Sequence, residues 1–189
     1  MVDVMFTTAK DVEGAEAVEP EPISANSSGS APQTGSGWQF TSPKEIQAKR
    51  ELILASLAAR EGVPLVRKTR ALYWNAQHNL RVACSVSKRY EGKGQYAYWY
   101  AYHPSWDDFL GEGQSSYFVL GCMDKDHAFA VPRGQLLEVL PFLNTTSPAD
   151  GKTYWHIHIT DRSGHSEMLV PKSNSVLPLE SYRIDFGAS

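Results

Sequence analysis

Segment 96–102, YAYWYAY, decides the fold class of this chain. Tyrosines occupy its four even positions, whereas Ala, Trp and Ala occupy the odd ones. A period of two sends successive side chains to opposite faces of a strand. The segment therefore predicts a strand, and we expect this strand to be central in a sheet.

Further strands are predicted on both sides of this segment. In segment 80–87, LRVACSVS, apolar side chains occupy the even positions and so share one face. Segment 117–123, YFVLGCM, is apolar without alternation, which is typical of a strand that is buried on both faces. Tight turns at 75–79 and 124–126 predict that these strands belong to hairpins.

Helices are predicted at three places. Ser42 and Pro43 form a helix start signal, and Gly62 ends the amphipathic segment that follows them. Shorter helices are expected at 104–110 and at 132–142.

The C-terminal part of the chain predicts two strands, at 154–160 and 168–170, followed by twenty residues without regular structure. Taken in order, the elements indicate the α+β class. We expect one mixed or mostly antiparallel sheet with an N-terminal helix and two further short helices.

Residues 1–43 differ in composition from the rest of the chain. They are acidic and rich in Pro, Gly and Ser, so they cannot bury enough apolar surface to offset the entropy of ordering. We therefore expect a disordered acidic tail at 1–43 and a single α+β domain at 44–189.

Charge is unevenly distributed along the chain, although its net value is only -3. Residues 44–103 carry eleven bases and four acids, whereas the segments before and after them are both net acidic. Such an asymmetry predicts an anionic partner, and DNA or RNA is the first candidate.

The expected compartment is the cytoplasm. Cys84 and Cys122 lie in different predicted strands without the spacing of a metal knuckle or a disulfide framework, so reduced thiols are expected. The sequence also shows no pattern of a signal peptide or of a membrane span, and no membrane partner is expected.

Segment 86–93, VSKRYEGK, leads from one predicted strand towards the aromatic strand. With the helix and hairpin before it and the short helix and buried strand after it, the layout of residues 44–142 resembles the PD-(D/E)XK nuclease superfamily. In that family a strand-borne acid and a Glu-x-Lys pair bind a divalent metal that activates water. The resemblance places Lys88 at the family lysine and Glu91 with Lys93 at a Glu-x-Lys triplet, and it implies Mg or Mn as the cofactor.

The chain departs from this family pattern at the acids. Val86 stands two residues before Lys88, where an acid is expected, and the hairpin carries Asn75 and Asn79 in place of Asp. These departures favour a degenerate relative that binds nucleic acid. An active metal-dependent nuclease and an unrelated α+β fold are the alternatives, so the sequence leaves open whether the protein is an enzyme.

Basic and aromatic side chains interleave between residues 67 and 99, a pattern that combines phosphate contacts with stacking surfaces. The candidates for phosphate contact are Lys68, Arg70, Lys88 and Arg89, and those for stacking are Trp74 and Tyr90. Two alternatives stay open. The aromatic residues form the core while the bases are solvated, or the aromatic sheet face docks a partner protein.

His156 and His158 occupy the same face of a predicted strand. This His-x-His spacing presents two ligands to a metal ion in several β proteins, so both residues are candidate metal ligands. The alternative is an exposed histidine pair without metal. Neither a Gly-x-Ser-x-Gly elbow nor a phosphate-binding glycine loop occurs in the sequence, so a serine nucleophile and a nucleotide-dependent activity are not expected.

Overall fold

The structure is a computed structural model, and it describes residues 41–91, 96–147, 151–162 and 164–186. These residues fall in one compact unit, Gln39–Ser189. Most of the predicted disordered tail, residues 1–40, lies outside the described residues.

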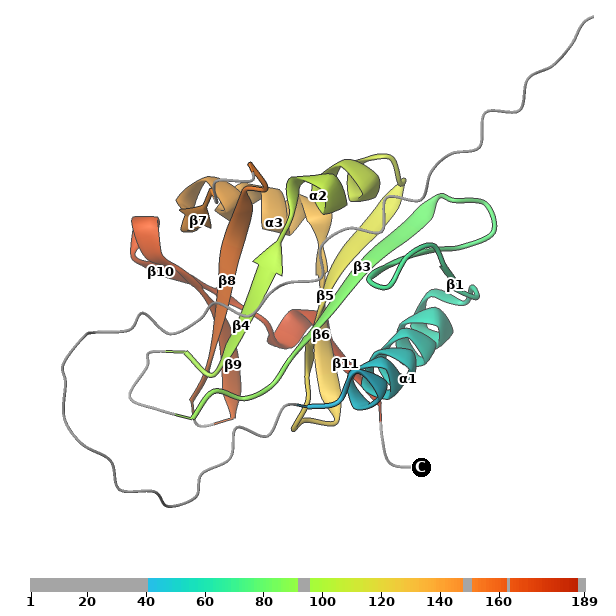
Figure 1. Cartoon of the computed structure of the whole chain (residues 1–189), viewed down its shortest axis with the longest axis horizontal. Coiled ribbons are helices and arrows are strands. Elements are labelled where there is room, and N and C mark those ends of the chain that lie inside the picture. The colour runs from blue at the N-terminus through green and yellow to red at the C-terminus, as the bar shows by residue number, and fades with distance from the viewer. Residues whose placement is uncertain (1–40, 92–95, 148–150, 163, 187–189) are drawn as a thin grey trace, which may run out of the picture. The chain divides into compact units, whose positions relative to one another are not determined.

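The described strands form two sheets (Figure 1). Sheet A has the order β1 (Val66–Arg67), β2 (Leu72–Trp74), β3 (Leu80–Ser87), β5 (Ser115–Cys122), β6 (His127–Pro132) and β11 (Arg183–Asp185). Sheet B has the order β10 (Ser175–Pro178), β9 (His165–Val170), β8 (Tyr154–Arg162) and β4 (Tyr98–Tyr102), with β7 (Thr145–Thr146) paired to β8. In sheet A, β3 and β5 are parallel and the other pairs are antiparallel, whereas sheet B is antiparallel throughout.

The α+β class, the N-terminal helix and the short helices are thus confirmed, but the strands divide between two sheets instead of forming one. After β3 the chain leaves sheet A. Its next strand, β4, pairs with β8, and β3 takes β5 as its neighbour. A change of sheet of this kind leaves no mark on the alternation of either strand.

Helix α1 (Pro43–Glu61) begins and ends where the sequence predicts. Ser42 and Glu45 form a capping box, in which each side chain accepts a hydrogen bond from the other's backbone N–H, at 3.2 and 2.9 Å. Gly62 ends the helix at φ +70°, a conformation that is easy only for glycine. The helix lies on the face of sheet A that is turned away from sheet B (Figure 1).

Two apolar cores result from this layering. In the first, Ile53 and Leu57 of α1 pack on Val82 and Cys84 of β3, which belong to the apolar even positions of segment 80–87. The second core lies between the two sheets, where Phe118 of β5 belongs to the same cluster as the tyrosines of β4. Strand β5 is accordingly buried on both faces, as its unbroken apolar run predicts.

The tyrosines of β4 fill the space between the sheets. Tyr98, Tyr100 and Tyr102 are almost completely buried, and their hydroxyls donate to Asp124, to the Gly121 carbonyl and to Asp107, each at 2.9 Å. This strand ends the hydrogen-bonded order of sheet B, so the expectation of a central position is wrong.

Tyr96 departs from the pattern of the other three tyrosines. Although it shares their even position, it stacks on His158, on the opposite face of sheet B, because the regular strand begins only at Tyr98. The inward-facing tyrosines are covered by the protein itself, and this face of β4 is therefore closed to a partner protein.

Two short helices lie beside each other at one end of the sheets (Figure 1). They are α2 (Pro104–Gly111) and α3 (Arg133–Val139), the latter continued by the 3-10 turn η1 (Leu140–Phe142). Among the described residues, no helix combines the length and the apolar character that crossing a bilayer requires.

The expectation of an irregular C-terminus is wrong. After the 3-10 turn η2 (Pro171–Ser173), β10 pairs with β9, and after η3 (Glu180–Tyr182), β11 pairs with β6. Strands of four and three residues are too short for a period of two to stand out in the sequence.

Replacing Gly121 with Ala should destabilise the protein. A Cβ at this position of β5 would lie 2.6 Å from Cδ1 of Ile53 and 3.1 Å from Cγ2 of Val86, so the contact between α1 and sheet A must shift. Overpacking of this kind costs about 1–3 kcal/mol. We expect chemical denaturation to show this loss. Gly134→Ala is the matched control, because nothing lies within 4 Å of its added Cβ; equal losses in both variants would contradict the packing argument.

Candidate nucleic-acid interface

The side chain of Asn75 bridges several residues of the turn between β2 and β3. The Oδ1 atom of Asn75 accepts a hydrogen bond from the backbone N–H of Leu80 at 3.0 Å, and its Nδ2 donates to Gln77 and Asn79 at 3.1 and 2.6 Å. Asn75 itself is buried. The predicted turn chemistry of 75–79 is therefore realised as an internally bonded loop.

His78 projects from this turn and is exposed to solvent. Its imidazole stacks on the indole of Trp74, with centroids 3.8 Å apart and planes 20° apart. The backbone of His78 has φ +57°, in the left-handed region that is uncommon for residues other than glycine. The turn thus holds an exposed aromatic stack in a conformation with a local energetic cost.

Arg81 connects the turn to α2 through hydrogen bonds. This buried side chain donates to the carbonyl oxygens of His78 and Phe109 at 3.1 and 3.0 Å, and it forms an ion pair with Glu112. Its guanidinium also lies 4.9 Å from the ring centroid of Phe109, in α2. Arg81 is therefore a structural link between the turn and α2, with its charge balanced by Glu112.

Lys68 supplies an exposed charge beside the stack. Its ammonium lies 4.7 Å from the ring centroid of Trp74 and 4.8 Å from that of Phe109. We refer to the set formed by Lys68, Trp74, His78, Arg81 and Phe109 as the turn cluster. Arg70, another predicted phosphate contact, is half-buried in the link between β1 and β2.

The six predicted nucleic-acid contacts fall into two groups. Trp74 pairs with Arg81 near the start of β3, whereas Lys88 follows its last residue. Eight residues of strand span about 26 Å. The structure therefore places Lys68, Arg70 and Trp74 at one end of β3, and Lys88, Arg89 and Tyr90 at the other.

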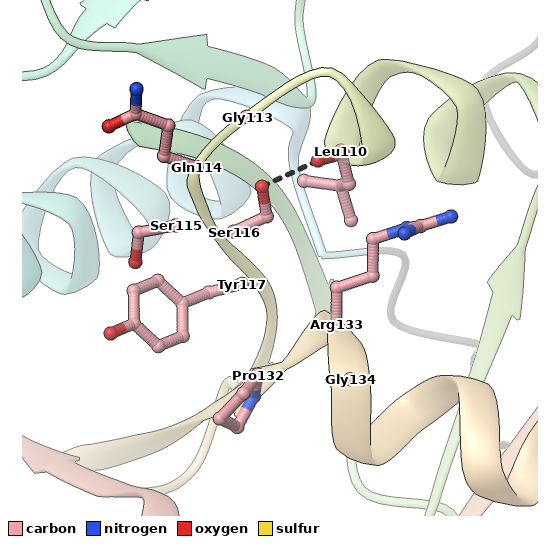
Figure 2. Close-up of a pocket in the computed structure, with 9 residues that line it drawn as sticks. All are labelled: Leu110, Gly113, Gln114, Ser115, Ser116, Tyr117, Pro132, Arg133 and Gly134. Atoms are coloured by element: carbon pink, nitrogen blue, oxygen red, sulfur yellow. Dashed lines mark hydrogen bonds between the residues drawn. The ribbon is translucent and has the colours of Figure 1, made fainter. Parts of the chain in front are cut away.

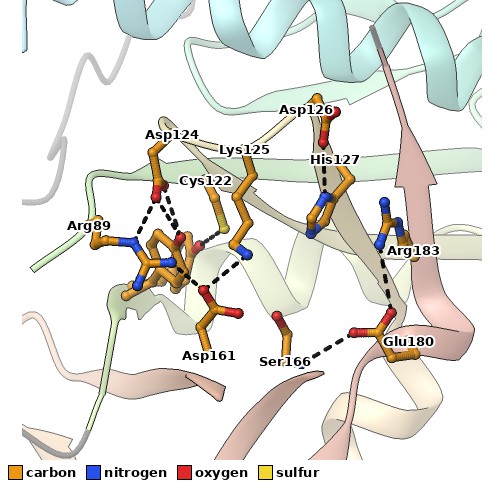
Figure 3. A network of polar contacts seen from close by, with 12 residues as sticks. Arg89, Cys122, Asp124, Lys125, Asp126, His127, Asp161, Ser166, Glu180 and Arg183 are labelled. Carbon is orange, nitrogen blue, oxygen red and sulfur yellow. Dashed lines mark hydrogen bonds and ion pairs between the residues drawn. The ribbon is translucent and has the colours of Figure 1, made fainter. Parts of the chain in front are cut away.

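Arg89 belongs to a polar network that joins both sheets (Figure 3). Its Nε donates to Asp124 at 2.7 Å and its Nη2 donates to Asp161, while Lys125 pairs with Asp161 at 3.0 Å. The network connects the end of β3 with the β5–β6 turn and the end of β8. A phosphate at Arg89 would have to compete with two carboxylates, so its role in binding stays a prediction.

The two carboxylates of this network are stabilised in their charged form. Burial opposes ionisation of Asp124, but hydrogen bonds from Arg89 and Tyr98 outweigh it and lower the pKa of this carboxyl. Burial likewise opposes ionisation of Asp161, and hydrogen bonds from Lys125 and Arg89 lower its pKa.

The Glu-x-Lys triplet can be placed only in part. Lys88 lies over the ring of Tyr90, with 5.7 Å between its ammonium and the centroid, and Glu91 is exposed. Lys93 lies outside the described residues. Catalytic roles for these three charged residues stay predictions.

His156 and His158 share the outer face of β8, the face turned away from sheet A. Nδ1 of His156 accepts a hydrogen bond from Nε1 of Trp99 at 3.3 Å, and Nε2 lies 2.6 Å from the Thr146 hydroxyl. Because an indole N–H only donates, Nδ1 must be unprotonated and Nε2 carries the proton. Both nitrogens of His156 are therefore already engaged by protein groups.

Burial lowers the pKa of both histidines. The pKa of His158 falls to about 4, because electrostatic interaction with His156 adds to the effect of burial. Both rings are therefore neutral at neutral pH. Within the described ranges, no group of three or more His, Cys, Asp or Glu residues is arranged to hold a metal ion. Metal binding by this pair stays a prediction.

A cavity of about 300 Å³ lies between the α2–β5 connection and the start of α3 (Figure 2). Its cationic residue, Arg133, donates to both carboxylate oxygens of Asp107 at 2.8 and 2.9 Å, and its guanidinium points away from Ser115 and Tyr117 (Figure 2). The hydroxyl of Ser116 donates to the carbonyl of a residue in α2 at 2.6 Å. Since these polar groups are satisfied internally, the cavity is a weaker candidate than the turn cluster.

The two cysteines are buried and unpaired, in agreement with the expectation of reduced thiols. Burial raises the pKa of Cys84 to about 12 and that of Cys122 to about 11. Thiols that resist ionisation in this way are poor nucleophiles.

Sequence reasoning missed His78, which it treated only as part of a turn. The relevant signal is an aromatic residue at the end of a strand followed four positions later by a histidine that can adopt positive φ, as Trp74 and His78 do. Such a pair is informative only once the turn geometry between them is known.

Comparison with protein-family models, with curated proteins and with solved structures finds no match to this chain. The resemblance to the PD-(D/E)XK superfamily therefore stays a prediction.

Replacing Asp161 with Asn should lower stability at neutral pH by about 1.5–3 kcal/mol, because hydrogen bonds to a charged group are lost. The pKa of Asp161 lies below its ordinary value of 3.8 in the folded protein, so its contribution is complete above that value and is lost as the pH falls further. Urea denaturation should therefore show a wild-type advantage at pH 7 that shrinks below about pH 4.

The matched control for this prediction is Asp108→Asn, at an exposed carboxylate of α2. We expect little change in its stability at either pH. An advantage of wild type over Asp161→Asn that persists unchanged at acid pH would refute the electrostatic explanation.

Proposed function

We propose that this protein binds nucleic acid through the turn cluster. The observation that carries the proposal is the exposed ring of His78, which is stacked on Trp74 beside the ammonium of Lys68. A cation next to an exposed aromatic face matches the two components of a nucleotide, a phosphate and a planar base.

Each component of the turn cluster has a distinct role in this proposal. Lys68 contacts a phosphate, and the outward face of His78 stacks on a base, while Trp74 supports the imidazole from beneath. Arg81 and Phe109 position the turn relative to α2 and do not touch the ligand. Four of the five residues of the cluster belong to the basic segment 44–103, whose net positive charge would attract a polyanion before contact is made.

Rigidity of the turn supports this assignment. The hydrogen bonds of Asn75 and Arg81 fix the loop that presents His78, so little side-chain or backbone entropy is lost when a ligand binds. The left-handed backbone of His78 has an energetic cost that the fold maintains, and conformations of this kind cluster at functional positions.

Binding, and not cleavage, is the function that we propose. Val86 stands where a strand-borne acid would help to hold the metal of a nuclease. A protein with this function would work inside the cell, in keeping with the cytoplasmic location that the sequence predicts.

Lys68→Glu should weaken binding to labelled DNA and RNA oligonucleotides by about tenfold, which corresponds to about 1.4 kcal/mol. Loss of a phosphate contact should also reduce the slope of log affinity against log salt by about one. Fluorescence anisotropy titrations at low and moderate salt measure both effects. Lys172→Glu changes another exposed lysine, in η2, and should leave affinity nearly unchanged; equal effects of the two reversals would contradict a localised site.

His78→Gly separates binding from folding. Glycine adopts positive φ without strain, so thermal unfolding should occur at the wild-type temperature or above it. Affinity for the oligonucleotides should fall about 5- to 100-fold, because stacking on an aromatic side chain contributes about 1–3 kcal/mol per base. His165→Ala, at an exposed histidine of β9, is the control. Unchanged affinity of the His78 variant would remove His78 from the site.

A further inference from the structure

The outer face of sheet B carries a series of aromatic rings that continues onto α2. In spatial order the rings belong to Trp106, His103, Tyr154, His156, His158 and Tyr96, with neighbouring centroids 4.2–6.0 Å apart. We refer to this set as the ring series. All six side chains are half-buried, so each retains some accessible surface.

The ring series ends near Lys88 on one side and on α2 on the other. At one end, Tyr96 lies 6.1 Å from Tyr90, over whose ring the ammonium of Lys88 lies. At the other end, Trp106 belongs to α2, the helix that also carries Phe109 of the turn cluster, three residues later. One helix therefore links the ring series to the turn cluster.

The histidines of the ring series behave as neutral aromatic rings. Burial lowers the pKa of His103, His156 and His158, and the hydrogen bonds of His156 fix its uncharged form. A series of this kind offers planar apolar surface without strong attraction for phosphate, which suits the bases of a nucleic acid better than its backbone.

We propose that the ligand is single-stranded nucleic acid, whose unpaired bases contact the ring series while the turn cluster binds a phosphate through Lys68 and one further base through His78. This inference rests on the proposed function and adds the class of ligand. In a duplex the bases stack on one another and pair, so their faces cannot reach a row of rings on a sheet. In a single strand they can, and since every base has a planar face, such contacts tolerate most sequences.

Lys88 acquires a role in this arrangement. It lies where a strand leaving the ring series would pass, next to Tyr90, and so contacts a phosphate at the far end of the site. The two groups of predicted binding residues, which lie at opposite ends of β3, then belong to one extended site and need not touch each other.

The test uses the full chain with oligothymidine, oligouridine and a mixed-sequence duplex of equal length. Wild type should bind the single strands at least tenfold more tightly than the duplex. Tyr154→Ala and Tyr96→Ala should each weaken single-strand binding about 5- to 100-fold, with little effect on the duplex, because a base contact is lost. Tyr154→Phe and Tyr96→Phe, which keep the rings, should bind as wild type does.

A second measurement covers the case in which an alanine variant fails to fold. Ultraviolet cross-linking of wild type to oligouridine, followed by peptide mass spectrometry, should give adducts on peptides that contain Tyr96, Tyr154 or Trp106. Adducts that are confined to residues 66–81 would overturn the role of the ring series.

The outcomes separate the two proposals. If wild type binds none of the three ligands, the proposed function fails. If it binds and Lys68→Glu weakens binding, but the duplex is bound as tightly as the single strands or the alanine variants bind like wild type, the function stands and the inference about single strands is overturned.

Discussion

The fold depends on burying three tyrosine rings without leaving a hydroxyl unpaired. Tyr98, Tyr100 and Tyr102 stand in line on β4, and each hydroxyl reaches a partner contributed by a different part of the chain: the β5–β6 turn, the backbone of β5 and helix α2. An unpaired hydroxyl in such a core would cost about 1–3 kcal/mol. The position of sheet B over sheet A is therefore specified by polar contacts as well as by apolar packing, which alone tolerates sliding.

The same requirement explains why the two faces of sheet B differ. The large inward-facing tyrosines of β4 occupy the space between the sheets, so the intervening residues of the strand, Trp99 and Ala101, turn outwards beside His158 and His156. The ring of His156 in β8 lies beside Trp99 and accepts the hydrogen bond that the indole N–H donates. The accessible aromatic rings of this protein are thus a consequence of how its core is filled.

Local patterns predicted most elements of the fold. The helix start at Ser42 and Pro43, the alternation of segment 80–87 and the apolar run of β5 depend on near neighbours, and all three are confirmed. The division into two sheets and the pairing of β11 were not predictable, since they depend on which distant strand fills an edge. For the candidate site, the sequence identified Lys68 and Trp74 but could not show that Arg89 is engaged by Asp161, which lies 72 residues away.

The order in which the chain visits the two sheets has a consequence for how the protein is made. The chain builds part of sheet A, crosses to β4, returns for β5 and β6, crosses again for β7 to β10, and ends the described strands with β11 on sheet A. Neither sheet is encoded by a continuous stretch, so no single cut releases one of them intact. During synthesis, the edge of β6 that pairs with β11 stays without its partner strand until β11 has left the ribosome. Contacts between residues so distant in sequence also slow folding. The two sheets should accordingly form and melt as one cooperative unit.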